Sequence, residues 1–463
     1  MTTPSRYNEK TPQLLHNQKK YNTYRLTFGE MLYENYSYSI GADGLKIEFT
    51  FRLNDKIAFR PTAHIPKRSF LDFNQPRELM DTLVFNIGMA ELISYWKCVC
   101  PPVMKVVPHK LSDDQTAFWK KLYYNGLGEF FYTNGIRATE DDFMTIESDG
   151  PTLNTTARQS DNATTNYLVP IGGGKDSVVT LELLRDQGVR PLIMNPRGAT
   201  KLCAGVGGFD MDETLVIHRT IDPLLLDLNS KGCLNGHTPF SAMLAFYTLL
   251  AATLAGVRSV ALSNENSANE STVAGSSVNH QYSKSLEFEN DFRGYIANHV
   301  TNDVRYFSFL RPLSELQIAM LFSRYSKYFD VFKSCNAGSK EDIWCGKCAK
   351  CLFAYIILSP FIEPKRLDAI FGKAMLDDIE LRGYFEQLTG HCESKPFECV
   401  GTIAEVNTAL TMTKRRWYAD GSEPRLLKGF AYDGPATPTG TLMPDHNLTD
   451  AEVNLLTKAI RNL

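Results

Sequence analysis

The periodicity of apolar positions changes part-way along the chain. Residues 36–40 and 45–51 alternate apolar and polar side chains, as strands do, and the turn-forming sequence GADG lies between them. Residues 79–96 then carry apolar side chains at helical intervals, and residues 117–132 form an aromatic-rich stretch that we expect to be core. This order predicts an N-terminal α+β domain over residues 1–145.

Residues 146–166 are rich in Ser, Thr, Asp and Asn, which is typical of a linker. After them, short apolar runs alternate with helical segments. The predicted strands cover residues 168–171, 191–195, 214–219, 259–263 and 304–310, with helices over 177–187 and 239–255. Such alternation predicts an α/β domain over residues 167–334 with a doubly wound parallel sheet. Residues 335–463 begin with a cysteine cluster and are then predicted to be helical.

The first strand of this series ends in the sequence GGGKDS, which we name the glycine loop. It comprises Gly172, Gly173, Gly174, Lys175, Asp176 and Ser177. Glycines let the backbone approach an anion closely, and N–H groups at a helix start attract phosphate. We expect Lys175 to neutralise phosphate charge, Asp176 to hold Mg²⁺ and Ser177 to offer a hydroxyl. The pattern matches neither G-x-x-x-x-G-K-[ST] nor G-x-G-x-x-G. The alternative is an ordinary turn in which Asp176 or Ser177 caps the helix.

Other polar residues lie near the same predicted sheet edge. Ligands of parallel sheets bind at the carboxyl ends of the strands, so we expect Asn195 and Asn264 to contact the nucleotide. The alternative for Asn264 is an exposed turn. Cys233 and His237 precede the helix at residue 239, and either could serve as an acid or base. A single histidine near a helix start can equally be a cap or a packing residue.

Four of the ten cysteines form the pattern C-x9-C-x2-C-x2-C. They are Cys335, Cys345, Cys348 and Cys351. This spacing suits tetrahedral zinc, and four thiolates leave no open position, so the zinc would be structural. An iron–sulfur cluster and a redox dithiol are the alternatives. We expect most of the six scattered cysteines to be buried thiols.

Composition excludes several classes of protein. The chain has 463 residues, of which 43% are hydrophobic and 22% charged, so it is expected to form two or three globular domains. A net charge of −3 gives no general attraction to nucleic acid or to an anionic membrane. Residues 1–20 carry no signal-peptide pattern, and the uncharged run 240–257 is short for a membrane span. We therefore expect a cytoplasmic protein without a membrane or nucleic-acid partner.

The glycine loop resembles the SGGxDS loop of the PP-loop ATP pyrophosphatases, which cleave ATP between the α- and β-phosphates. Gly172 stands where that family has serine. The cysteine pattern is similar to the one that follows the nucleotide domain in the 7-cyano-7-deazaguanine synthase branch of these enzymes. The resemblance implies ATP and Mg²⁺ as cofactors, release of AMP and pyrophosphate, and adenylation of a substrate.

Several segments together resemble the MurL family, the UDP-N-acetyl-α-D-muramoyl-L-alanyl-L-glutamate epimerases. They are residues 83–96, 126–132, 170–177, 237–241 and 345–351. This resemblance implies inversion of the terminal L-glutamate of a UDP-linked muramoyl dipeptide, UDP-MurNAc-L-Ala-L-Glu, through an acyl adenylate, in peptidoglycan precursor synthesis. Adenylation removes the carboxylate charge, so a side-chain base can take the α-proton. Cys233 and His237 are the candidate bases, and Asp222 and Glu265 stay open beside them.

Two other functions fit the same motifs. One is a PP-loop enzyme that modifies tRNA or forms a deazaguanine-type nucleobase. The other is a nucleotide-binding regulator without turnover.

Overall fold

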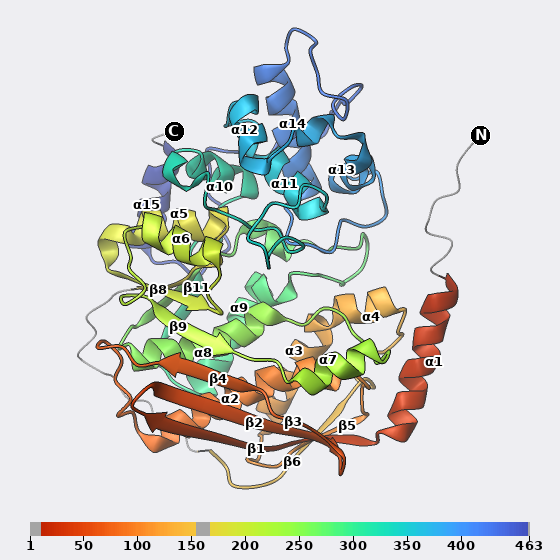
Figure 1. The fold of residues 1–463 in the computed structure, drawn as a ribbon, viewed down its shortest axis with the longest axis vertical. Coiled ribbons are helices and arrows are strands. Elements are labelled where there is room, and N and C mark those ends of the chain that lie inside the picture. The colour runs from red at the N-terminus through yellow and green to blue at the C-terminus, as the bar shows by residue number, and fades with distance from the viewer. Residues whose placement is uncertain (1–10, 154–166, 462–463) are drawn as a thin grey trace.

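The computed structural model describes residues 11–153 and 167–461 (Figure 1). Its strands form one 11-stranded sheet in the order β11-β10-β7-β8-β9-β4-β2-β1-β5-β6, with β3 paired to β2. The strands are β1 (Glu30–Gly41), β2 (Gly44–Asn54), β3 (Ile57–Phe59), β4 (Thr62–Pro66), β5 (Val103–Val106), β6 (Thr145–Ser148), β7 (Tyr167–Pro170), β8 (Val189–Met194), β9 (Leu215–Arg219), β10 (Ser259–Leu262) and β11 (Arg305–Ser308).

The half of the sheet from β11 to β9 is parallel throughout. Its strands are buried on both faces: in β7, Leu168 joins one apolar core and its neighbour Val169 joins the other. Burial on both faces explains the short, continuous apolar runs in this part of the sequence. The strand order reverses between β7 and β10, which makes the carboxyl end of β7 the topological switch point.

The N-terminal half joins this sheet directly. β4 pairs with β9 in antiparallel register, with Ala63 opposite Arg219. Beneath that junction the Arg219 guanidinium makes two hydrogen bonds of 2.6 Å to the carboxylate of Glu91, a buried residue of α2. Two charges removed from water are stable only when paired in this way. The pair therefore fixes α2 against the parallel half.

The helices cover the sheet and form a separate cluster at one end of the molecule, where Figure 1 shows α11 to α14. They are α1 (Thr11–Thr27), α2 (Arg77–Trp96), α3 (Asp113–Gly126), α4 (Gly128–Asn134), α5 (Lys175–Leu184), α6 (Gly198–Val206), α7 (Pro223–Ser230), α8 (Phe240–Leu254), α9 (Leu286–His299), α10 (Glu315–Phe322), α11 (Ala349–Leu358), α12 (Pro364–Phe371), α13 (Arg382–Thr389), α14 (Ile403–Trp417) and α15 (Asp450–Arg461). Among these described helices, none has the length and apolar character needed to cross a membrane.

The structure confirms a mixed α/β fold with a large, mostly parallel sheet and a helical C-terminal region that carries the cysteine cluster. The sequence did not indicate that both halves share one sheet. Residues 146–148, where we expected the linker to begin, belong to β6, and residues 154–166 of that expected linker lie outside the described residues. One apolar core also runs from Tyr21 to Tyr306, across the boundary expected at residue 145.

Candidate active site

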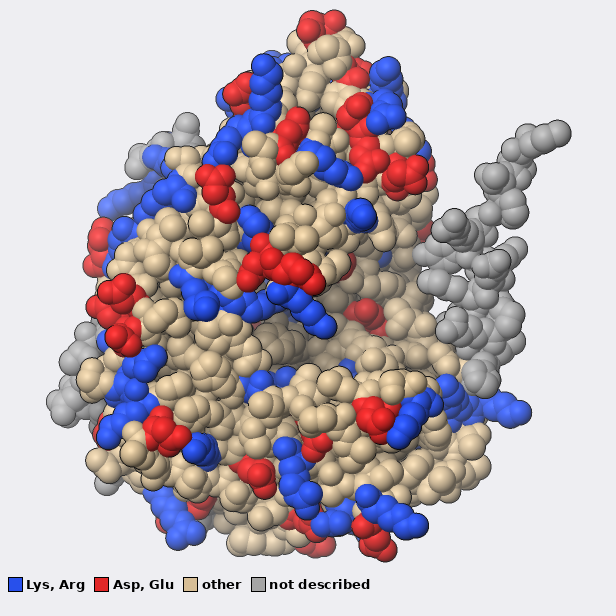
Figure 2. Space-filling view, viewed as in Figure 1, with Lys and Arg blue, Asp and Glu red and all other residues tan. Residues whose placement is uncertain are grey.

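A cavity of about 360 Å³ lies at the carboxyl ends of β7 and β10. Its wall includes most of the glycine loop, the segments that follow β10 and precede the cysteine cluster, and several charged side chains from distant parts of the chain. The face drawn in Figure 2 is hollowed below the helical C-terminal part, with both basic and acidic residues at the edge of the hollow. A cavity of about 500 Å³ lies elsewhere, beside Ser259 and Arg305 at the amino ends of β10 and β11, where ligands of parallel sheets do not bind.

The glycine loop turns sharply from β7 into α5. Gly173 has a φ of 84°, and Gly174 is the N-cap of α5. In the described part of the chain, no side chain caps this helix start. Its first N–H groups and its dipole are therefore available to an anion in the cavity.

Gly173 and Gly172 differ in the room around them. A Cβ on Gly173 would lie 3.2 Å from the backbone of Ala199 and Thr200, whereas a Cβ on Gly172 would meet no atom within 4 Å. We expect Gly173→Ala to lower the free energy of unfolding by about 1–2 kcal/mol, because it forces a left-handed conformation on a residue with a side chain. Gly172→Ser is the matched control and should leave stability near that of the wild type.

Urea unfolding measures both variants. Equal stability of the two would contradict the loop conformation described here. A stable Gly172→Ser variant would also mean that the serine typical of the PP-loop family fits this loop without rearrangement.

Lys175 does not line the cavity, contrary to expectation, and lies behind two carboxylates that do. Its ammonium bonds to the carboxylates of Asp176 and Glu315, and its side chain is only 6% exposed. The reason is that the first residue of α5 faces α10, which packs directly against that helix. Four other cationic side chains line the cavity and supply its positive charge: Arg197, Lys284, Lys333 and Lys350.

Asp176 lines the cavity and its side chain is 30% exposed. Burial raises the pKa of this carboxyl, but the ammonium groups of Lys175 and Lys350 hold it below its usual value. Asp176 is therefore ionised at neutral pH and presents a carboxylate oxygen of the kind that Mg²⁺ prefers.

The other expected nucleotide contacts divide into two groups. Ser177 and Asn264 line the cavity; the Ser177 hydroxyl donates to the Gly174 carbonyl at 3.0 Å, and Asn264 Nδ2 donates to Ser308 Oγ at 3.0 Å. Asn195 does not line it. Its Oδ1 accepts a 2.7 Å hydrogen bond from the Arg219 backbone N–H, which fixes the end of β8.

The structure separates Cys233 and Asp222 from the cavity. Cys233 Sγ contacts the Tyr24 hydroxyl at 4.0 Å, and Asp222 is the N-cap of α7. His237 lies in a neighbouring cluster, with Nδ1 3.3 Å from a Glu129 carboxylate oxygen. Burial and the nearby His280, Lys97 and Lys284 lower the pKa of His237 to about 3, so it is neutral. Glu265 does line the cavity.

A second cluster of charged groups reaches the same cavity, and no local sequence pattern predicts it. Cys399 lines the cavity together with Lys284. Its Sγ lies 3.0 Å from Lys284 Nζ and 3.9 Å from His280 Nε2. Burial raises the pKa of the thiol, but Lys284, the His280 hydrogen bond and Lys350 outweigh this and lower it to about 5.

His280 links Cys399 to a carboxylate. Its Nδ1 lies 2.5 Å from Glu129 Oε2, on the opposite side of the ring from the sulfur. Burial lowers the pKa of His280, but hydrogen bonds to Cys399 and Glu129 prevail and raise it to about 9. At neutral pH the cluster therefore places a thiolate beside an imidazolium whose other nitrogen contacts Glu129.

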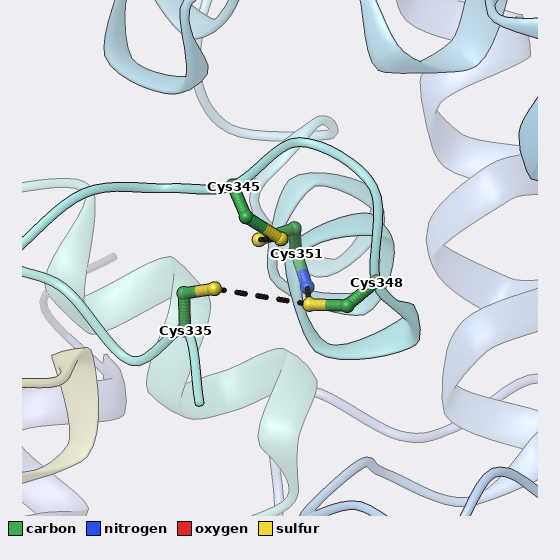
Figure 3. A group of neighbouring side chains, drawn as sticks. All are labelled: Cys335, Cys345, Cys348 and Cys351. Carbon is green, nitrogen blue, oxygen red and sulfur yellow. Dashed lines mark hydrogen bonds between the residues drawn. The ribbon is translucent and has the colours of Figure 1, made fainter. Parts of the chain in front are cut away.

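The four clustered cysteines come together as predicted (Figure 3). The Sγ atoms of Cys335 and Cys348 lie 3.8 Å apart, and those of Cys345 and Cys351 lie 3.7 Å apart. A tetrahedron with Zn–S bonds of ~2.3 Å has edges of ~3.8 Å, so the arrangement fits zinc. Backbone N–H groups of Gly338, Lys347 and Cys351 donate to three of the sulfurs, as they do to thiolates.

The segment around the first cysteine also contacts the glycine loop. The Lys333 backbone N–H donates to the Gly173 carbonyl at 2.8 Å. The Asp342 carboxylate accepts hydrogen bonds from the N–H groups of Gly198 and Ala199, at 2.7 and 3.0 Å, at the start of α6. The cysteine cluster thus holds one wall of the cavity.

Comparison with known proteins finds matches to both parts of the chain that line this cavity. The MurL N-terminal domain matches residues 23–309, and the MurL C-terminal domain matches residues 331–432. The chain is 36% identical over 351 residues to the UDP-N-acetyl-alpha-D-muramoyl-L-alanyl-L-glutamate epimerase of Xanthomonas oryzae pv. oryzae, covering 74% of this chain and 76% of that protein. It is 37% identical over 331 residues to the protein of the same description from a Micromonospora species, covering 69% and 72%. The chain therefore belongs to the MurL epimerase family.

Proposed function

We propose that this protein converts the terminal L-glutamate of UDP-MurNAc-L-Ala-L-Glu to D-glutamate through an acyl adenylate, with release of AMP and pyrophosphate. Family membership supports the substrate and the inversion, since its curated relatives are named for both. We place the reaction in peptidoglycan precursor synthesis in the cytoplasm, with no membrane or nucleic-acid partner.

The glycine loop supports ATP as the activating substrate. It lies at the switch point of a parallel sheet with strand order β11-β10-β7-β8-β9, and it starts an uncapped helix. We assign this sheet to the doubly wound PP-loop type, in which such a loop binds pyrophosphate. This position of the loop is the single observation that carries the proposal of ATP cleavage.

The charged residues of the cavity have different roles in the proposed adenylation. Asp176 would hold Mg²⁺, which neutralises phosphate charge when bound. Lys175 does not line the cavity, so the cations that would meet the phosphates are those in its wall: Arg197, Lys284, Lys333 and Lys350. The substrate carboxylate attacks the α-phosphorus of ATP, a P–O bond forms, and the bond to pyrophosphate breaks.

Activation makes inversion possible. The α-proton of a free glutamate carboxylate is hard to remove, because the enolate would place a second negative charge beside the first. The adenylate has no carboxylate charge, so its enolate is more accessible to a side-chain base. Reprotonation on the opposite face gives D-glutamate, and hydrolysis of the adenylate releases AMP.

The test is to incubate the protein with ATP, Mg²⁺ and UDP-MurNAc-L-Ala-L-Glu, and to follow AMP and the chirality of the released glutamate. We expect AMP only when the substrate is present, together with D-glutamate. Substrate-dependent AMP without D-glutamate would rule out the epimerase. No AMP with this substrate would favour a regulator, and AMP that forms with tRNA instead would favour a modifying enzyme.

A further inference from the structure

We propose that Cys399, whose sulfur contacts the Lys284 ammonium and the His280 ring, is the side chain that exchanges a proton with the α-carbon of the adenylated glutamate. The inference rests on the proposed function and deepens it by naming the base. Cys399 replaces Cys233 as the candidate base, because Cys233 does not line the cavity.

Cys399 lies in the same cavity as the glycine loop. Its side chain lines the cavity that also contains Gly172, Gly174 and Asp176. A carboxylate adenylated at the glycine loop therefore lies in the same confined space as this sulfur. Cys399 is also partly exposed, as a residue in the wall of a cavity is expected to be.

Two basic side chains contact the sulfur of Cys399. Lys284 Nζ lies 3.0 Å from the sulfur, and His280 Nε2 lies 3.9 Å from it. Glu129 fixes the His280 ring from the other side, through the 2.5 Å contact with Nδ1. Neighbouring Lys and His side chains of this kind favour the thiolate form of a cysteine, which is the form that can accept a proton.

A metal ion is the competing explanation for part of this cluster. Ligand atoms of Glu129, His237 and His280 lie within 4.8 Å of one another. However, Glu129 and His280 Nδ1 are already in direct hydrogen-bond contact, and the ammonium of Lys284 lies against the nearby sulfur. A cation beside that ammonium would be repelled, so the geometry favours proton transfer.

The proposed step conserves charge and atoms. The Cα–H bond of the adenylate breaks and its proton goes to Cys399 Sγ, which becomes a thiol. The electron pair of that bond forms the C=C bond of the enolate, and the carbonyl π pair moves onto oxygen. A second acid, recharged by solvent, then forms a C–H bond on the opposite face. The thiol returns its proton to solvent and the thiolate is restored.

Two variants test this step, Cys399→Ala and Cys399→Ser, assayed with ATP, Mg²⁺ and UDP-MurNAc-L-Ala-L-Glu in deuterated water. Both should form AMP in response to the substrate, yet lose ~10²-fold or more of D-glutamate formation and of deuterium incorporation at the α-carbon. Cys392→Ser is the matched control, because Cys392 is exposed, lies in the same segment and does not line the cavity.

Three outcomes would overturn the proposal. The first is D-glutamate formation at the wild-type rate in either variant. The second is loss of AMP formation in both, which would place Cys399 in the ATP half-reaction. The third is a second zinc per chain that Cys399→Ser removes. A wild-type protein that forms no AMP with the substrate would instead contradict the proposed function itself.

Lys284 is a positioning residue in this proposal, and its effect can be measured on the thiol directly. The charged groups that face Cys399 are Lys284, His280 and Lys350. Glu398 precedes it in the chain, and Asp176 and Glu265 act on Lys284 from across the cavity. The thiolate is the form that reacts with iodoacetamide. The rate of Cys399 alkylation should therefore stay constant as the pH falls and decline only near the pKa of this thiol, about 5.

In Lys284→Met the decline should begin at higher pH, because the nearest cation that favours the thiolate is gone. Lys284→Arg retains the positive charge and should restore the wild-type profile. Peptide mass spectrometry of the alkylated protein separates Cys399 from the other cysteines. Identical profiles in wild type and Lys284→Met would contradict the role of Lys284.

Discussion

Asp176→Ala is expected to lower substrate-dependent AMP formation by ~10²-fold or more, the usual cost of removing a group that stabilises transition-state charge. Asp176 is the one carboxylate of the glycine loop, and it lines the cavity in its ionised form. Without it, the Mg²⁺ that would neutralise the triphosphate loses its protein ligand. The rate of AMP release, measured at saturating ATP and substrate, checks this expectation.

The fold should survive this substitution. Lys175 would lose one of its two carboxylate partners, but Glu315 would still pair with its buried ammonium. Asp186→Ala is the matched control, because Asp186 follows α5 and is exposed to solvent. We expect full AMP formation in that control. Full AMP formation in Asp176→Ala as well would mean that the glycine loop is not the ATP site.

The parallel half of the sheet was predictable because each of its strands and helices is recognisable from a short stretch of sequence. A strand buried on both faces is a short apolar run, and the helix that follows it has its own periodicity. The junction between the halves has no such signature. β4 alternates buried and half-buried residues, β9 begins as a short buried apolar run, and only the folded chain brings Ala63 opposite Arg219. Two expected domains therefore share one sheet.

The predicted parts of the site likewise lie within short segments, and the unpredicted parts are formed by residues far apart in the sequence. The glycine loop and the four cysteines are each contained in one short segment, and their spacing already indicates their chemistry. Cys399 depends on Lys284 and His280, which lie 115 and 119 residues earlier in the chain. Without those partners it is indistinguishable from an ordinary buried thiol. The pairing of Lys175 with Glu315, which keeps it out of the cavity wall, likewise depends on where α10 packs.

Two of the four clustered cysteines lie at the start of α11 and a third lies in the wall of the cavity, so the stability of the two regions should be linked. Cys348 is the N-cap of α11, and Cys351 lies in its first turn. Cys335 follows directly after Lys333 and Ser334, which line the cavity, and the Lys333 backbone bonds to Gly173. A zinc ion bound by all four sulfurs would therefore tie α11 to the wall of the glycine loop. Loss of the metal should release that wall as well as the helix.

Cys351→Ser is accordingly expected to abolish zinc binding and to lower the free energy of unfolding by more than ~4 kcal/mol, the range reached when a structural metal is lost. Cys351 is fully buried, so the serine hydroxyl would also lie in a site built for thiolates. Zinc content by elemental analysis and urea unfolding measure the two effects, with Cys392→Ser as the control. Because the same segment lines the cavity, AMP formation should fall together with the metal content. A zinc-free variant with wild-type stability and activity would show that the four sulfurs do not support this wall.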